Sequence, residues 1–396
     1  MWERDGKDQQ AMAHGTAQKF TIAVPDAVLT DLRERLARTR LPGEVRDSGW
    51  DYGTNLAYLK ELIEYWRTQY DWRKHERELN AFDHFKVTIN GCNIHFIHQP
   101  GVDPNPKPLL LLHGWPGSIA EFQQIIPMLT DPARHGGEPA DAFTVVAPSL
   151  PGYGFSDHPR TRAMNIQAMA ELFHKLMTET LGYQRYAVQG GDWGSAITSR
   201  IGETHADSVY GIHLNMIAVG PAEGRHAPEL TPEEKVFLGD MDKFRTSETG
   251  YQWIQGTKPQ TLAYGLNDSP AGLAAWIVEK FRTWSDCHGD VEKSFTKDQI
   301  LTNVTIYWMT QTINSSTRLY YEVRHHPWRL KPGTKIEAPT AVALFPGELI
   351  LPPRHWAERV YNIKRWTMMP KGGHFAAMEE PELLAADVRE FFRESS

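Results

Sequence analysis

The sequence has few cysteines and no long apolar run. Its 396 residues include only Cys92 and Cys287, too few for a disulfide framework and in keeping with a reducing compartment. No stretch is apolar enough to span a bilayer. Residues 1–18 are polar, of mixed charge, and lack the apolar core of a signal peptide. We therefore expect a soluble, cytoplasmic protein with no membrane partner and a disordered tail over 1–18.

An excess of positive charge is also absent. The net charge is −7, which argues against a nucleic-acid partner. The hydrophobic fraction of 41% is ordinary for a globular protein, and the length suits one large domain with an insertion or two domains. The 13 tryptophans favour an aromatic-lined apolar cavity, although core packing is the ordinary role of most such rings.

Two amphipathic helices are expected near the N-terminus. The first follows Asp26, which we expect to be its N-cap, and the second is indicated within 55–70. Their apolar faces consist of Leu29, Leu32 and Leu36 in the first helix and Leu56, Leu59, Ile63, Trp66 and Tyr70 in the second. We assign both helices to an N-terminal extension over 19–84.

Strand patterns dominate from residue 85 onward. Alternating apolar residues on either side of Asn90-Gly91 predict a β-hairpin. Six apolar runs separated by helical patterns predict buried strands of a doubly wound, mostly parallel sheet. These runs begin at Pro108, Phe143, Tyr186, Gly211, Thr340 and Lys364. No clear buried strand occurs between 218 and 330, so we expect a helical cap over 218–330, inserted into an α/β core of 85–217 and 331–396.

The pentapeptide Gly190-Gly191-Asp192-Trp193-Gly194 lies between a predicted strand and a helical pattern. It matches the G-x-nucleophile-x-G elbow of α/β-hydrolases, where small residues permit a tight, strained turn. A plain glycine-rich turn with an aspartate N-cap would have the same sequence. The pentapeptide alone therefore leaves both interpretations open.

The order of other acidic and basic residues favours the elbow. In α/β-hydrolases the nucleophile is followed along the chain by an acid and then a histidine. Asp192, Glu348 and His374 have this order, and each follows a predicted strand. The carboxyl ends of parallel strands meet at the edge of the sheet where ligands bind. The motif HGWPGS ends an earlier strand, so the backbone N–H groups of Trp115 and Trp193 are the expected oxyanion-hole donors.

A carboxylate at the elbow predicts a particular kind of substrate. Asp192 can attack saturated carbon and form an alkyl ester, whose hydrolysis needs a water activated by His374 and an orienting acid, Glu348. Epoxides and alkyl halides both offer such a carbon. An opening epoxide needs a proton donor, whereas a departing halide needs N–H donors. Several tyrosines in the predicted cap could donate a proton: Tyr251, Tyr264, Tyr307, Tyr320 and Tyr321.

Beyond these patterns, the chain resembles the microsomal-type epoxide hydrolases of the α/β-hydrolase superfamily. The resemblance covers nearly everything after about residue 17. It is carried by "PDAVLTDLRERLARTRLP", "HGWPGS", "GGDWGS", "GYQWIQGTKPQTLAYGLNDSPAGLAAWIVEKF", "SSTRLYY", "FPGE" and "GGHFAAMEEPELL". It implies an α/β-hydrolase fold and an N-terminal meander that wraps the core and the cap. Mammalian members have an N-terminal membrane anchor, whereas this sequence has a polar tail, so it looks like a soluble, microbial-type member.

The resemblance also implies roles for individual residues. Asp192 matches the family's nucleophile, His374 its general base and Glu348 its orienting acid. Tyr251 looks like one ring-opening tyrosine. Tyr320 looks like the other, although the adjacent Tyr321 leaves that register open.

The leading hypothesis is an epoxide hydrolase that adds water to a small apolar epoxide and yields a vicinal diol. No metal or organic cofactor is expected, and the adjacent His325 and His326 lack further ligands around them. The alternatives are a haloalkane or haloacid dehalogenase with the same triad, and a non-catalytic binding protein of the same fold. The patterns leave open the particular epoxide, a role in detoxification or secondary metabolism, and whether the chain forms a homo-oligomer.

Overall fold

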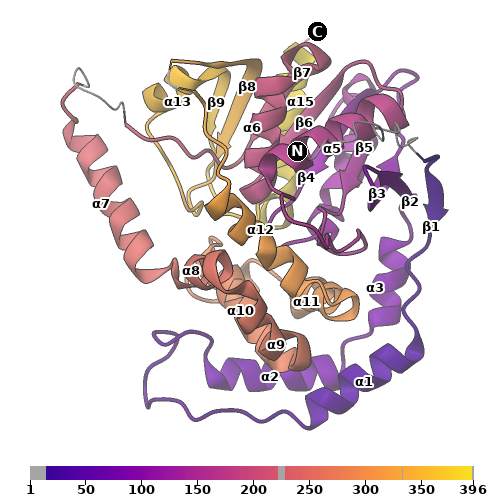
Figure 1. Ribbon diagram of the computed structural model, residues 1–396, viewed down its shortest axis with the longest axis vertical. Helices are drawn as coiled ribbons and strands as arrows, with labels where there is room; N and C mark the ends of the chain where they lie inside the picture. The colour runs from indigo at the N-terminus through magenta and orange to yellow at the C-terminus, as the bar shows by residue number, and fades with distance from the viewer. Residues whose placement is uncertain (1–14, 222–227, 332, 395–396) are drawn as a thin grey trace, which may run out of the picture.

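A computed structural model describes residues 15–221, 228–331 and 333–394. Its centre is a nine-stranded sheet in the order β1-β2-β3-β5-β4-β6-β7-β8-β9 (Figure 1). The strands are β1 (Gln18–Phe20), β2 (His84–Ile89), β3 (Cys92–Gln99), β4 (Lys107–Leu112), β5 (Phe143–Pro148), β6 (Tyr186–Gly190), β7 (Val209–Leu214), β8 (Ile336–Leu344) and β9 (Tyr361–Met368). The predicted hairpin and the strands at all six predicted positions are therefore confirmed, but β9, at the edge of the sheet, is only partly buried.

The sheet is parallel except at the β1 edge. β1, β2, β3 and β5 pair in antiparallel fashion, whereas all pairs from β5 through β4 to β9 are parallel. Asn90 and Gly91 have φ angles of 50° and 76°, as the two-residue turn between β2 and β3 requires. The parallel part brings the carboxyl ends of β4, β6, β8 and β9 to one edge, and this confirms the predicted mostly parallel sheet.

Helices cover both faces of the sheet. α4 (Ile125–Thr130) and α15 (Pro381–Glu394) pack over one face through a cluster that includes Ile126, Val388 and Phe391. α5 (Ile166–Lys175), continued by a π-helical turn at Leu176–Thr180, packs with α6 (Asp192–Thr204) on the other face. The second face shares a single apolar cluster with the N-terminal helices and the segment between β7 and β8. Burial of these faces is the main stabilising contribution to the core.

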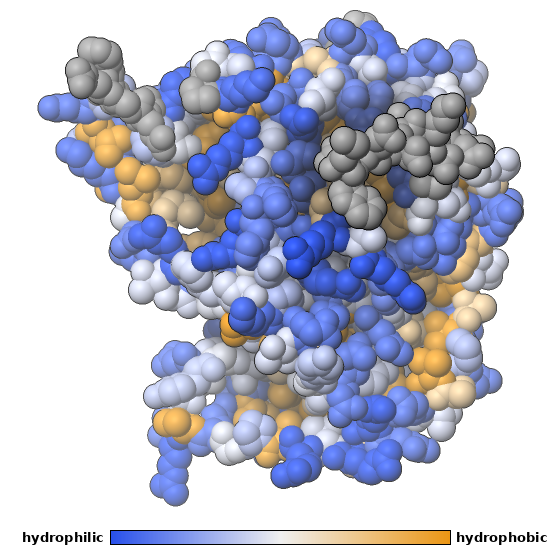
Figure 2. Space-filling model, viewed as in Figure 1, coloured by the Kyte–Doolittle hydropathy of each residue, from blue (hydrophilic) through white to orange (hydrophobic). Residues whose placement is uncertain are grey.

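The described residues of the segment between β7 and β8 form helices joined by loops and contain no strand. Its longer helices are α7 (Pro232–Ser247), α8 (Gly250–Thr257), α9 (Pro259–Asp268), α10 (Pro270–Thr283), α11 (Lys297–Thr310) and α12 (Ile313–His325). Together they form a layer over the carboxyl edge of the sheet, from which α7 projects to one side (Figure 1). In Figure 2 this face of the protein is mostly polar, with apolar side chains gathered over the first half of α7.

The N-terminal helices run along the far side of that helical layer. They are α1 (Asp26–Ala37), α2 (Leu56–Thr68) and α3 (Trp72–Leu79), and both α1 and α2 contact α10 (Figure 1). Trp66 donates from its indole to Thr305 on α11 at 3.1 Å, and the Tyr70 hydroxyl lies 3.1 Å from that of Thr302. The N-terminal segment thus ties the helical layer to the core.

Several details differ from the sequence-based expectations. Asp26 is the first residue of α1 and not its N-cap. Pro25 precedes it, and the Asp26 carboxylate pairs with Arg73 on α3. Tyr70 lies beyond the end of α2, although it is buried as expected. Of the tail expected over 1–18, residues 1–14 lie outside the described residues, and Gln18 already pairs in β1. No helix in the described part of the chain is long and apolar enough to cross a membrane.

Candidate active site

Asp192 lies at the turn between β6 and α6, in a strained backbone conformation. Its φ of 47° falls in the left-handed region, which is uncommon for residues other than glycine. The turn closes only because its neighbours have no side chain. A Cβ on Gly194 would lie 2.1 Å from the Leu112 carbonyl oxygen, and one on Gly190 would lie 2.4 Å from that of Gly194. The glycines therefore serve a tight elbow that projects the Asp192 carboxylate from the sheet edge.

The loop after β4 approaches the Asp192 carboxylate from one side. The Trp115 backbone N–H donates to Oδ1 of Asp192 at 2.8 Å. This approach requires glycine at 114, because a Cβ there would lie 2.1 Å from the same oxygen. Trp193 is the second residue of α6, where a backbone N–H has no intrahelical acceptor. The Trp115 amide therefore contacts the carboxylate, and the Trp193 N–H lies free in the first turn of α6, one residue after Asp192.

His374 and Glu348 form a buried pair beside Asp192. An isolated bridge between Gly347 and Gly373 joins the loops that follow β8 and β9. It brings His374 Nδ1 to 2.7 Å from Glu348 Oε1, while His374 Nε2 lies 3.4 Å from Asp192 Oδ2. Burial lowers the pKa of His374, but Glu348 and Asp192 together raise it well above the ordinary value.

An apolar cavity of about 250 Å³ opens on the Asp192 carboxylate. Its lining comes from α6, the loops after β7 and β8, and the helical layer. The lining residues are Asp192, Trp193, Ser195, Ala196, Ser199, Met216, Ile217, Ala218, Phe244, Tyr251, Gln252, Tyr320, Trp328, Leu349, Ile350 and Tyr361. Only one of them is ionised at neutral pH by its ordinary chemistry, namely Asp192, so an apolar ligand with one reactive polar atom fits this cavity.

Two of the five candidate tyrosines reach this cavity. Tyr251 on α8 and Tyr320 on α12 face one another with ring centroids 5.7 Å apart, and both are buried. Burial, with the charge of Asp192 adding to it, raises the pKa of Tyr251. Burial likewise raises the pKa of Tyr320 well above the ordinary value. Both phenols therefore stay protonated at neutral pH and remain hydrogen-bond donors.

The other three tyrosines lie elsewhere. Tyr321 stacks on His325 at 3.9 Å and does not line the cavity. Tyr264 is 71% exposed. The Tyr307 hydroxyl donates to the Gly117 carbonyl oxygen at 2.8 Å.

In the described part of the chain no cluster of metal-ligand residues occurs, and His325 belongs to none.

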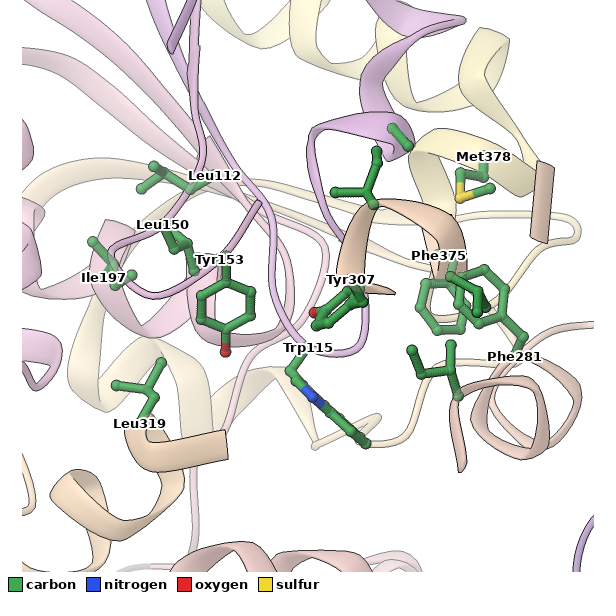
Figure 3. Packing of buried hydrophobic residues seen from close by; sticks show 14 of the residues in the cluster. Leu112, Trp115, Leu150, Tyr153, Ile197, Phe281, Tyr307, Leu319, Phe375 and Met378 are labelled. Carbon is green, nitrogen blue, oxygen red and sulfur yellow. The ribbon is translucent and has the colours of Figure 1, made fainter. Parts of the chain in front are cut away.

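The structure adds functional candidates that the sequence patterns missed. Asn303 on α11 donates to the Pro116 carbonyl oxygen at 2.7 Å and accepts from the Ser118 hydroxyl at 2.8 Å, so the helical layer holds the loop that carries the Trp115 amide. Figure 3 shows Trp115 and Tyr307 among the buried residues of one cluster. Glu121, on the short 3-10 helix η1 (Ile119–Phe122), lines a second small cavity with Asp192. In the sequence, the only sign of Glu121 was that it is a single acidic residue within an otherwise apolar segment.

The fold, the elbow and the acid–base pair place the protein among the α/β-hydrolases. Residues 107–381 match the family described as "alpha/beta hydrolase fold", and residues 17–122 match "Epoxide hydrolase N terminus". The N-terminal match ends at Glu121-Phe122, so it includes the whole of the meander and the HGWPGS loop.

Similar proteins and a solved structure show to which family the chain belongs. "Putative epoxide hydrolase" of Stigmatella aurantiaca (strain DW4/3-1) is 44% identical over 95% of this chain and 84% of that protein. "Epoxide hydrolase 1" of Oryctolagus cuniculus is 40% identical over 98% and 91%. The crystal structure of juvenile hormone epoxide hydrolase from the silkworm Bombyx mori has a TM-score of 0.86 at 33% identity, covering 96% of this chain and 95% of that one. The chain belongs to the epoxide hydrolase family.

Proposed function

We propose that this enzyme converts an apolar epoxide into a vicinal diol through an ester on Asp192. The observation that carries the proposal is the meeting of one carboxylate and two phenols, those of Tyr251 and Tyr320, in a single apolar cavity. A nucleophile and two proton donors are what ring opening of an epoxide needs at opposite ends of one C–O bond.

In the first step an Asp192 oxygen attacks one epoxide carbon, and the C–O bond at that carbon breaks. The epoxide oxygen takes a proton from Tyr251 or Tyr320, while the second phenol donates a hydrogen bond to it. The lining of the cavity is mostly apolar, so these donors act in a low dielectric where they stabilise the developing alkoxide strongly. The products of this step are an alkyl ester of Asp192 and one phenolate.

Formation of the ester prepares His374 for the second step. Esterification removes the Asp192 charge that helps to raise the pKa of His374, so the imidazolium gives up its proton, which restores the phenol, and the neutral ring becomes a base. Glu348 keeps the ring oriented through Nδ1. A water then transfers a proton to His374 Nε2 as its oxygen attacks the carboxyl carbon of Asp192.

The tetrahedral oxyanion is stabilised by the Trp115 and Trp193 amides, and its collapse releases the diol oxygen. That oxygen takes the proton held by His374. The second proton of the water passes from the regenerated Asp192 carboxyl to His374, which restores the starting protonation states, so the sum is one epoxide and one water giving one diol. No metal or organic cofactor enters this scheme.

The alternative is a dehalogenase, in which indole N–H groups bind the departing halide. The indole N–H groups of Trp115 and Trp193 have no hydrogen-bond partner in the described structure, which gives this alternative a basis. Both groups are buried, however, and of the two residues only Trp193 lines the apolar cavity that holds Asp192. The position of the two phenols favours the epoxide.

Intact-protein mass of His374→Gln tests the proposal. The variant is mixed separately with styrene oxide and with a small alkyl bromide, and any adduct is mapped by peptide analysis. We expect a mass gain equal to the whole epoxide on Asp192, because the ester forms and cannot be hydrolysed. A gain only from the bromide, equal to the alkyl group without halogen, would mean that the dehalogenase alternative is correct.

A further inference from the structure

A second, smaller cavity lies against Asp192. It shares only Asp192 with the apolar cavity, and its polar lining includes His374, Glu121, Gln189 and Asn215. Its space for the centre of a water molecule is about 20 Å³. One buried water needs roughly 10–15 Å³ on that measure, together with two to four polar partners, so the cavity fits a single water.

Glu121 is the polar group of this cavity that the proposed reaction has not used. It lies on η1, and its carboxyl occupies the space over Gly117, where a Cβ would lie 1.5 Å from Glu121 Oε1. Glycine at 117 therefore leaves room for the carboxyl, which lies beside the Ser118 backbone N–H and lines the cavity. Its neighbours on η1, Ala120 and Phe122, are buried and apolar.

The surroundings of Glu121 distinguish it from a structural acid. Burial raises its pKa to about 8, an effect that the charge of His374 opposes and the charge of Asp192 reinforces. No basic side chain pairs with Glu121 among the ion pairs of the described residues. Glu121 is only partly buried as a whole residue, but an acid held in a largely desolvated place without a cationic partner is costly and is found preferentially where its chemistry is used.

We propose that Glu121 is a further catalytic residue, whose carboxyl holds the water that hydrolyses the Asp192 ester. This inference rests on the proposed function. One O–H of the water donates to a carboxyl oxygen of Glu121 and the other to His374 Nε2, which leaves a lone pair aimed at the ester carbon. The substrate occupies the apolar cavity and the water the polar one, so the two reactants reach Asp192 through separate spaces.

The charge on Asp192 links the two steps. While Asp192 is ionised, its charge opposes ionisation of Glu121. The ester is neutral, and the loss of that charge favours the ionised, more strongly accepting carboxylate just when the water must be held. Either protonation state of Glu121 retains an acceptor oxygen.

Single-turnover kinetics on the full-length enzyme tests this role. Excess enzyme is mixed with styrene oxide, quenched at intervals and weighed as intact protein, which gives separate rate constants for formation and decay of the ester. We expect Glu121→Leu to form the ester within about threefold of the wild-type rate and to hydrolyse it at least about tenfold more slowly, because its water is no longer positioned. Glu121→Gln, which keeps one acceptor oxygen, should slow decay less.

Gly117→Ala provides an independent variant that leaves Glu121 in the chain. The φ of Gly117 is not in the left-handed region, so alanine fits the backbone, but its Cβ displaces the Glu121 carboxyl. It should slow decay of the ester as Glu121→Leu does. Glu76→Gln makes the same acid-to-amide change at a buried glutamate of α3, and should leave both rate constants unchanged.

The two rate constants distinguish failure of the proposed role of Glu121 from failure of the proposed function. Decay at the wild-type rate in Glu121→Leu and Gly117→Ala would overturn the role of Glu121, and so would equal slowing of both steps in both variants. Failure of wild-type enzyme and His374→Gln to form any ester with epoxides would instead overturn the proposed function.

Discussion

Two adjacent tyrosines, Tyr320 and Tyr321, provide the sharpest test of the ring-opening step. The substitution is phenylalanine at each position in turn, which removes one hydroxyl and keeps the ring. Tyr320 is 6% exposed and lines the cavity with Asp192, whereas Tyr321 stacks on His325 outside it. Only Tyr320→Phe should therefore affect the reaction.

The size of the effect follows from the setting of the phenol. Removing one preorganised donor from a water-poor site that stabilises a developing oxyanion costs about 2.7–4 kcal/mol of barrier, or roughly 10²–10³-fold in rate. Tyr251 remains as the second donor, so residual alkylation should be measurable. No water can replace the lost hydroxyl easily, because the surrounding lining of the cavity is mostly apolar.

The assay is the same rapid quench with intact-mass detection of the ester. Tyr320→Phe should slow ester formation by about 10²-fold or more and leave its decay within about threefold. Tyr321→Phe should match the wild type in both steps, which makes it the matched control. The reasoning would be refuted if Tyr321→Phe slowed ester formation more than Tyr320→Phe, or if Tyr320→Phe slowed formation and decay by the same factor.

Three further results are expected. Asp192→Asn should form no ester with epoxide on the time scale of wild-type turnover, and a normal rate by intact mass would remove Asp192 from the nucleophile's role. Glu348→Gln should lower the pKa of His374, because it deletes a charge that raises it, and should slow ester decay by about 10²-fold or more; histidine NMR titration and single-turnover decay check the two effects. Asp387 is buried beside His213. Burial raises the pKa of Asp387, but His213 and the other hydrogen bonds to the carboxylate hold that pKa at about 2, below the ordinary 3.8. The ionised Asp387 should therefore contribute about 2 kcal/mol of stability above pH 4, and this contribution should disappear as the pH falls through 2. The difference in thermal stability between wild type and Asp387→Asn should shrink over that range. A constant difference would contradict the prediction.

Much of the fold was predictable because it depends on local patterns. Continuous apolar runs predicted the six strands, although not that β9 is only partly buried, and Asn90-Gly91 predicted the hairpin, since side-chain periodicity and turn chemistry act over a few residues. The Asp26 prediction was wrong for a related reason. Its carboxylate has two possible partners, the free N–H groups of α1 and Arg73, and the second belongs to a helix that only the packed N-terminal segment brings near.

The sequence by itself determined which residues could do the chemistry. The elbow glycines, the order of Asp192, Glu348 and His374, and the HGWPGS loop are all visible as patterns, because each depends on a local turn or on the order of strands. Their catalytic roles remain predictions that the experiments above test.

The tertiary structure decided which groups meet. Successive residues on a helix point about 100° apart, so only the packing of α12 could place Tyr320 in the cavity and Tyr321 outside it. Glu121 matches no motif, and its place beside His374 arises from the folding together of segments more than 200 residues apart. Local sequence patterns thus specify the backbone that carries the reactive groups. Contacts between distant segments fix the directions of the reactive side chains and form the two cavities that open on Asp192.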